Sequence, residues 1–224
     1  MAKKQYDNDF PSVTQLIGQL RSPGLEMWFK LHTISEINEI SNRGKKIGTE
    51  IHNVIQTYIE TGKAKIETEY PVEVTNALKS FMLFRKEMPE IILKRAELAL
   101  THPILKYNGT IDCLGEKEKT VWLVDWKTSE AKEKNNPVIY DEAKIQVSAY
   151  CNLINEAEER TRGKNDPFEN AIIVGIAKDK IAYNTYFLNK EEIDGWFNEV
   201  FIPLKKIWDY RKKNRTEVTN GKTV

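Results

Sequence analysis

Two aspartates and a lysine interrupt otherwise apolar segments in the middle of the chain. Asp112 lies in GTIDCL (residues 109–114), and Asp125 and Lys127 lie in TVWLVDWK (residues 120–127). Both segments have the pattern of strands, and the polar run GEKEK between them is typical of a turn. Alternate residues of a strand share a face, so Asp125 and Lys127 point the same way, and a hairpin brings Asp112 beside Asp125.

Two carboxylates held close together repel each other unless a cation lies between them. Lys127 offsets part of that charge, and a divalent metal offsets it more fully. Mg²⁺ is bound by one or two carboxylates, waters and phosphate oxygens, and a bound metal activates water and stabilises charge on a transferring phosphate. The pattern therefore predicts phosphodiester hydrolysis with Mg²⁺, or alternatively Mn²⁺. The competing interpretation is a surface ion pair between Asp125 and Lys127, which would contribute little.

Four further residues stand where this chemistry needs them. Glu97 lies in the preceding strand pattern, and His52 lies in a helix with apolar periodicity. Gln146 and Tyr150 are four apart and share a helix face, where an amide and a phenol suit phosphate or water contacts. Three of them also have an ordinary structural explanation: a core histidine for His52, and a helix surface for Gln146 and Tyr150.

The remaining pattern predicts an α/β or α+β domain with one mixed sheet and helices on its faces. Ser12 is a candidate helix N-cap, and Gly62 is expected to end a long helix. Helices are expected over residues 12–20, 22–29, 35–59, 72–88, 138–157 and from about 190, and strands over residues 91–101, 109–114, 120–127, 171–178 and 180–188.

The overall charge does not point to a polyanionic partner, because the formal net charge of the 224 residues is +1. Nucleic-acid binding would need local basic clusters. One candidate is Arg43, Lys45 and Lys46, just before His52, and another is the basic stretch 201–224, whose cations would also suit a helix end.

Cysteine content and targeting signals narrow the class of protein. The two cysteines, Cys113 and Cys151, form no zinc or disulfide pattern and are expected to be buried apolar residues. There is no signal-peptide pattern and no apolar run long enough to span a membrane, so a cytoplasmic protein without membrane contact is expected.

The motifs together resemble those of the PD-(D/E)XK nuclease superfamily, and within it the RecB-like exonucleases. GTIDCL is similar to the family's G-x-x-D strand, VDWKTS to its (D/E)-x-K strand, KIQVSAYCNLI to its Q-x-x-x-Y helix, and RGKKIGTEIHNVIQTYIETG to its RGxxxH helix. The segment PSVTQLIGQLRSPGLEMWF resembles the opening of phage exonucleases and of the mitochondrial genome maintenance exonuclease family.

The resemblance implies a restriction-endonuclease-like core and a role for each residue. Residues 1–88 would form an N-terminal helical segment, residues 89–213 the nuclease core and residues 214–224 a flexible tail, within one compact domain. Metal ligands would be His52, Asp112, Asp125 and the backbone carbonyl of Trp126; catalytic residues would be Asp112, Asp125, Lys127 and Glu97; and substrate contacts would come from Arg43, Lys45, Lys46, Thr128, Gln146 and Tyr150.

The implied activity is that of a DNA exonuclease in phage-type recombination, replication or repair. DNA ends would be the substrate, a single-strand-annealing or single-strand-binding protein the protein partner, and a phage the expected source. An iron–sulfur cluster of the kind found in some RecB-like relatives is not expected, because two cysteines cannot supply four thiolates. Two alternatives stay open: a catalytically inactive DNA-binding or assembly protein of the same fold, and a restriction-type or structure-specific endonuclease.

Overall fold

A single mixed sheet organises the part of the chain that the computed structural model describes, namely residues 7–20, 23–63, 70–131, 135–162 and 168–220. Its five strands lie in the order of the sequence, and only the β3–β4 pair is parallel. The strands are β1 (Ile92–His102), β2 (Tyr107–Lys117), β3 (Thr120–Ser129), β4 (Ala171–Ala177) and β5 (Tyr183–Leu188). A parallel pair needs a crossover connection, which α5 (Asp141–Arg162) supplies.

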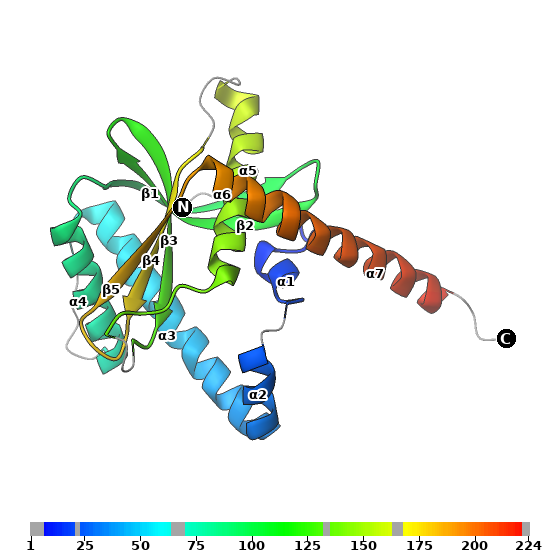
Figure 1. Ribbon diagram of the computed structural model, residues 1–224, viewed down its shortest axis with the longest axis horizontal. Coiled ribbons are helices and arrows are strands. Elements are labelled where there is room, and N and C mark those ends of the chain that lie inside the picture. The colour runs from blue at the N-terminus through cyan, green and yellow to red at the C-terminus, as the bar shows by residue number, and fades with distance from the viewer. Residues whose placement is uncertain (1–6, 21–22, 64–69, 132–134, 163–167, 221–224) are drawn as a thin grey trace.

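One face of the sheet is covered by α3 (Ile34–Thr61) and α4 (Val72–Glu87), seen on one side of the strands in Figure 1. The apolar side of α3 packs there through Ile51 and Ile55, which are buried with Trp126 of β3. Phe81 and Phe84 of α4 meet the indole of Trp126 edge-on. These aromatic contacts hold β3 in place directly beside Asp125.

The opposite face is covered by α5 together with elements from both ends of the chain. These elements are α1 (Val13–Ile17), α6 (Lys190–Gly195), the π-helical segment η2 (Trp196–Phe201) and α7 (Ile202–Asn220). Helix α2 (Pro23–Leu31) lies with the first turns of α3 away from the sheet, and α7 projects from the body toward the right of the view (Figure 1). The fold class expected from the sequence, a mixed sheet flanked by helices with an N-terminal helical segment, is confirmed.

Helix ends follow the expected capping chemistry. The Ser12 hydroxyl accepts a hydrogen bond from the Gln15 N–H at 3.1 Å, which confirms Ser12 as the N-cap of α1. Gly62 ends α3 with φ of +71°, a left-handed conformation that favours glycine. Both cysteines are free and buried, as expected.

The structure differs from the sequence prediction mainly at element ends. Strand β2 is longer than residues 109–114, because β1 pairs with it from Tyr107 to Glu116. Strand β5 begins at Tyr183 rather than at residue 180, because the chain turns where the Ala177 N–H donates to the Ala182 carbonyl.

Helix α7 continues to Asn220, so residues 214–220 of the expected tail are helical, and the flexibility of that tail stays a prediction. That stretch has no glycine or proline to stop a helix, and its first glycine is Gly221. Residues 221–224 lie outside the described residues. The division of the chain at residues 88 and 89 stays a prediction.

Candidate active site

The two aspartates meet where the hairpin of β2 and β3 opens. The ladder runs from Lys117–Thr120 to Cys113–Val124. At the next position the strands no longer pair; instead, the Trp126 N–H donates to Asp112 Oδ2 at 2.9 Å. The predicted hairpin is therefore present, and its open end holds the Asp112 carboxylate.

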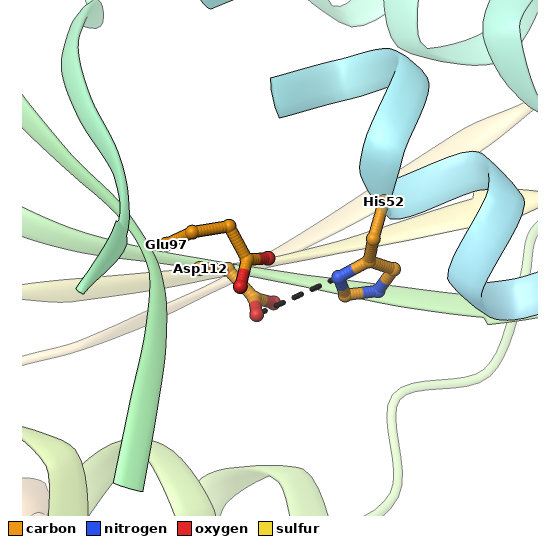
Figure 2. A group of neighbouring side chains, drawn as sticks. All are labelled: His52, Glu97 and Asp112. Atoms are coloured by element: carbon orange, nitrogen blue, oxygen red, sulfur yellow. Dashed lines mark ion pairs between the residues drawn. The ribbon is translucent and has the colours of Figure 1, made fainter. Parts of the chain in front are cut away.

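Asp112 forms a cluster with residues from two other elements. Asp112 Oδ1 lies 3.5 Å from His52 Nδ1 of α3, drawn as the dashed line in Figure 2. One side-chain ligand atom from each of His52, Glu97 and Asp112 lies within 4.8 Å of the others. Figure 2 shows the Glu97 carboxylate of β1 turned toward the Asp112 carboxylate, with the imidazole approaching from the helix. We call these three residues the triad.

Glu97 reaches this cluster through an unusual backbone conformation. Its φ is +53°, in the left-handed region, although it lies inside a strand. The neighbouring pairs Ala96–Cys113 and Leu98–Ile111 keep the register, so Glu97 stands opposite Asp112. A non-glycine residue in this region costs roughly 1–3 kcal/mol, and such residues cluster at functional sites. The observation points to a functional use of the Glu97 carboxylate.

Asp125 and Lys127 form the second half of the site. Lys127 Nζ lies 2.6 Å from Asp125 Oδ2, and the Asp125 side chain has no exposed surface. The ammonium of Lys127 meets Asp125 Oδ2, while Asp125 Oδ1 has no hydrogen-bond partner among the described residues. Burial raises the pKa of Asp125 to about 6. The alternative of an ordinary surface ion pair is therefore wrong.

The charged side chains of the site shift one another's pKa values. Burial works to raise the pKa of Asp112, but His52, Lys127 and the Trp126 N–H outweigh it and lower that pKa. Burial opposes the charged forms of His52 and Lys127, yet the neighbouring carboxylates raise the pKa of both side chains. Lys127 thus remains an ammonium in a largely enclosed site.

The donor set fits a divalent cation. Carboxylate oxygens are the ligands that Mg²⁺ and Mn²⁺ prefer, and the triad supplies two carboxylates and an imidazole nitrogen within reach of one another. Asp112, Glu97 and Asp125 together bring three carboxylates to the site, whereas Lys127 forms its ion pair with Asp125, so a cation would offset the remaining negative charge. Relative to the predicted ligands, Glu97 joins His52 and Asp112, whereas Asp125 is turned to Lys127. The ligand roles of Asp125 and the Trp126 carbonyl stay predictions.

Two cavities flank the open end of the hairpin. The first, of about 520 Å³, is lined by the triad with Lys45 and Tyr150; we call it the triad cavity. The second, of about 510 Å³, is lined on its polar side by Lys127, Thr128 and Gln146; we call it the lysine-side cavity. Gln146 Nε2 donates to Tyr150 Oη at 2.7 Å, so this pair connects the walls of the two cavities.

The three basic residues before His52 differ in their placement. Arg43 is engaged by an ion pair with Glu73 of α4. Lys45 is exposed and lines the triad cavity, and Lys46 is exposed but lines neither cavity. Of the three, Lys45 is therefore the one positioned to contact a substrate phosphate in the triad cavity.

Sequence reasoning missed Thr14, which lines both cavities from α1. Its placement depends on Asn108, whose side-chain amide donates to the carbonyls of Asp7 and Phe10 and so holds the N-terminal segment on β2. Nothing in the local pattern around Thr14 signals this long-range contact. Gly109 was also missed as a packing residue, although a glycine inside a strand pattern is a recognised sign of close backbone approach.

A membrane-spanning helix is not found among the residues that the structure describes.

Curated relatives of this chain carry the name mitochondrial genome maintenance exonuclease 1. The protein from Xenopus tropicalis is 27% identical over 219 residues, covering 91% of this chain and 58% of the relative. The protein from Mus musculus is 25% identical over 223 residues, covering 92% and 61%. The chain thus spans about three-fifths of the length of these relatives.

Among solved structures, an alkaline exonuclease from Laribacter hongkongensis is similar with a TM-score of 0.36 and 13% identity, covering 76% of this chain and 86% of that one. The family model of the PD-(D/E)XK nuclease superfamily matches residues 26–207, a range that contains the triad, Asp125 and Lys127. The chain therefore belongs to the PD-(D/E)XK nuclease superfamily.

Proposed function

We propose that this chain is a metal-dependent DNA exonuclease that hydrolyses phosphodiester bonds. One observation carries the proposal: the His52, Glu97 and Asp112 triad, built from three separate elements, adjoins the buried Asp125–Lys127 pair at the open end of one hairpin. A strained glutamate and an ion pair whose aspartate is fully buried are costly features for a purely structural site.

A divalent cation would be held by Asp112, Glu97 and His52, with Asp125 and the Trp126 carbonyl as further ligands. When bound, it supplies Lewis acidity toward a phosphate oxygen and lowers the pKa of a coordinated water. The Trp126 N–H orients Asp112 by its hydrogen bond to Oδ2 and leaves Oδ1 on the His52 side. Mg²⁺ is the expected ion and Mn²⁺ the expected substitute.

Lys127 supplies the positive charge on the other side of the site. Its ammonium is held by Asp125 and keeps its proton, because the two aspartates raise its pKa. It lines the lysine-side cavity, where it can orient an attacking water or stabilise charge on the scissile phosphate. Thr128 and Gln146 line the same cavity, while Tyr150 and Lys45 line the triad cavity, and these residues are proposed to hold the substrate's phosphates.

Exonuclease action is preferred over the alternatives for two reasons. The matched relatives are named exonucleases, although this chain spans only 58% to 61% of their length. A catalytically inactive relative would normally have lost part of the acidic set, whereas Glu97, Asp112, Asp125 and Lys127 are all present. A role in recombination, replication or repair, a single-strand-binding or annealing partner, and a cytoplasmic, phage-encoded setting stay predictions.

The test is cleavage of end-labelled linear single- and double-stranded DNA beside a closed circle, with Mg²⁺ and with EDTA. We expect metal-dependent loss of linear DNA with the circle spared, and the labelled end gives the polarity. Cutting of the circle would replace the proposal by an endonuclease. Binding without any cleavage would favour the DNA-binding alternative.

A further inference from the structure

The lysine-side cavity differs from the triad cavity in the character of its walls. Away from Lys127 it is lined mainly by apolar side chains, namely Ile17, Leu20, Leu25, Val138 and Tyr140. These come from α1 and the turn after it, from α2 and from the segment leading into α5. Three of them keep large exposed surfaces: Leu25 is 42% exposed, Val138 36% and Tyr140 63%. An open apolar groove beside a charged site is a binding feature that packing alone does not account for.

The position of this groove limits what can enter it. Lys127, Thr128 and Gln146 form its polar end, and Lys127 is held there by the buried Asp125. Thr14 stands between the two cavities because it lines both. A strand that places one phosphate against Lys127 must therefore lay its adjacent atoms into the apolar groove or away from the protein.

A nucleobase matches the groove chemically. Its faces are apolar and stack on aromatic rings, and Tyr140 offers an exposed ring at the groove. Its edges need hydrogen-bond partners, and the polar side chains of Thr128 and Gln146 line the same cavity. In a duplex, the hydrogen-bonding edge of a base is already engaged by its partner base. The groove therefore fits an unpaired base.

We propose that the lysine-side cavity is a base-binding subsite, in which one unpaired base of the DNA strand stacks on Tyr140 next to the phosphate held at Lys127. This proposal rests on the proposed function in one respect, because that function identifies the ligand as DNA. Leu25 and Val138 form its apolar walls, and Gln146 contacts the base edge.

The test is an abasic scan of single-stranded oligonucleotides. Oligonucleotides carrying one abasic nucleotide, moved stepwise from the end, are bound to the full chain in EDTA and followed by fluorescence anisotropy. We expect one or two positions where loss of the base weakens binding by about fivefold or more. Tyr140→Ala should weaken binding of intact DNA by a similar factor and remove the dependence on position, because the base and the ring form one interaction.

Matched variants separate this effect from a general loss. Tyr210→Ala removes an equally exposed tyrosine from α7, which lines neither cavity, and should keep the position dependence of the wild type. Leu25→Ala supplies a second groove variant should Tyr140→Ala fail to fold, as checked by thermal melting. It should reduce the dependence on position.

The outcomes distinguish this subsite from the proposed nuclease activity. A uniform effect of the abasic nucleotide along the strand, or additivity with Tyr140→Ala, would overturn the subsite even if Mg²⁺-dependent cleavage is observed. Position-dependent binding that Tyr140→Ala removes, in a protein that cleaves no DNA, would support the subsite and overturn the nuclease proposal.

Discussion

Lys127 forms an ion pair with Asp125, in which the lysine side chain is partly exposed and the aspartate side chain is fully buried. We expect Lys127→Ala to lower cleavage by about 10²-fold or more, because a positioned charge at the reacting phosphate is lost. DNA binding should change little, since other residues line both cavities. Single-turnover cleavage and anisotropy on one labelled substrate measure both. Lys94→Ala, which removes an exposed lysine of β1 paired with Glu116, is the control. Wild-type cleavage by Lys127→Ala would remove Lys127 from the mechanism.

Metal binding by the Glu97 carboxylate would explain the strained backbone conformation of this residue. We expect Glu97→Gln to raise the Kd for Mn²⁺ by about tenfold or more, since a neutral amide replaces a charged ligand. Isothermal titration calorimetry measures this without any substrate. Glu116→Gln changes a glutamate of β2 outside the triad and should leave the Kd unaltered. Equal Kd values for Glu97→Gln and the wild type would contradict the metal role.

The sequence predicted the positions of some site residues but not of others. Asp112, Asp125 and Lys127 were placed together correctly because a short turn and strand alternation determine their positions locally. The approach of Glu97 to Asp112 depends on a positive φ that no strand pattern signals. The contribution of Thr14 depends on a contact between Asn108 and the N-terminal segment, about a hundred residues away in the sequence.

At the scale of elements, Gly109 sets how closely α5 approaches β2. A Cβ atom there would lie 2.7 Å from Tyr150 Cε1 and 2.8 Å from Leu153 Cδ2. Gly109→Ala should therefore lower the free energy of unfolding by about 1–3 kcal/mol, because the helix and strand must separate. Urea denaturation measures the change.

Gly195 provides the matched control for that substitution. It ends α6 with φ of −61°, and a Cβ atom would meet nothing within 4 Å. Gly195→Ala should leave the free energy of unfolding unchanged or raise it slightly. Equal effects of the two substitutions would show that close packing at Gly109 is not what limits stability there.

Ser80 joins α4 to the turn between β4 and β5. Its hydroxyl accepts from the Ala182 N–H at 3.0 Å and lies 3.1 Å from the Ala177 carbonyl and 3.2 Å from the Lys180 carbonyl. Ser80 is fully buried, so Ser80→Ala leaves these groups without that partner and should cost about 1–3 kcal/mol. Chemical denaturation beside Ser35→Ala, at an exposed position of α3, tests this. No difference between the two variants would contradict it.

Element types were more predictable than element ends. Alternating and helical periodicity located the strands and helices because each has one or two buried faces. The length of β2 and the start of β5 depend on which residues find backbone partners in a neighbouring strand, which the local pattern does not contain. Helix α7 continues past residue 214, where no glycine or proline interrupts the chain before Gly221.

At the scale of the molecule, the site exists because the sheet brings distant segments together. Helix α3 covers one face, α1 and α5 cover the other, and the triad and the Asp125–Lys127 pair meet at the open end of the central hairpin. Local patterns could not place His52 or Glu97 beside Asp112, whereas the resemblance to a nuclease family assigned both residues to the site. With a net charge of +1, DNA binding must depend on local basic residues, of which Lys45 lines the triad cavity.

The central claim is that these dispersed residues form one metal site. The most direct measurement is the anomalous diffraction of a crystal of the protein soaked in Mn²⁺. We expect a Mn²⁺ peak bounded by His52, Glu97 and Asp112. This peak should be lost in crystals of Glu97→Gln or Asp112→Asn. A Mn²⁺ peak elsewhere on the molecule, with none at the triad, would contradict it.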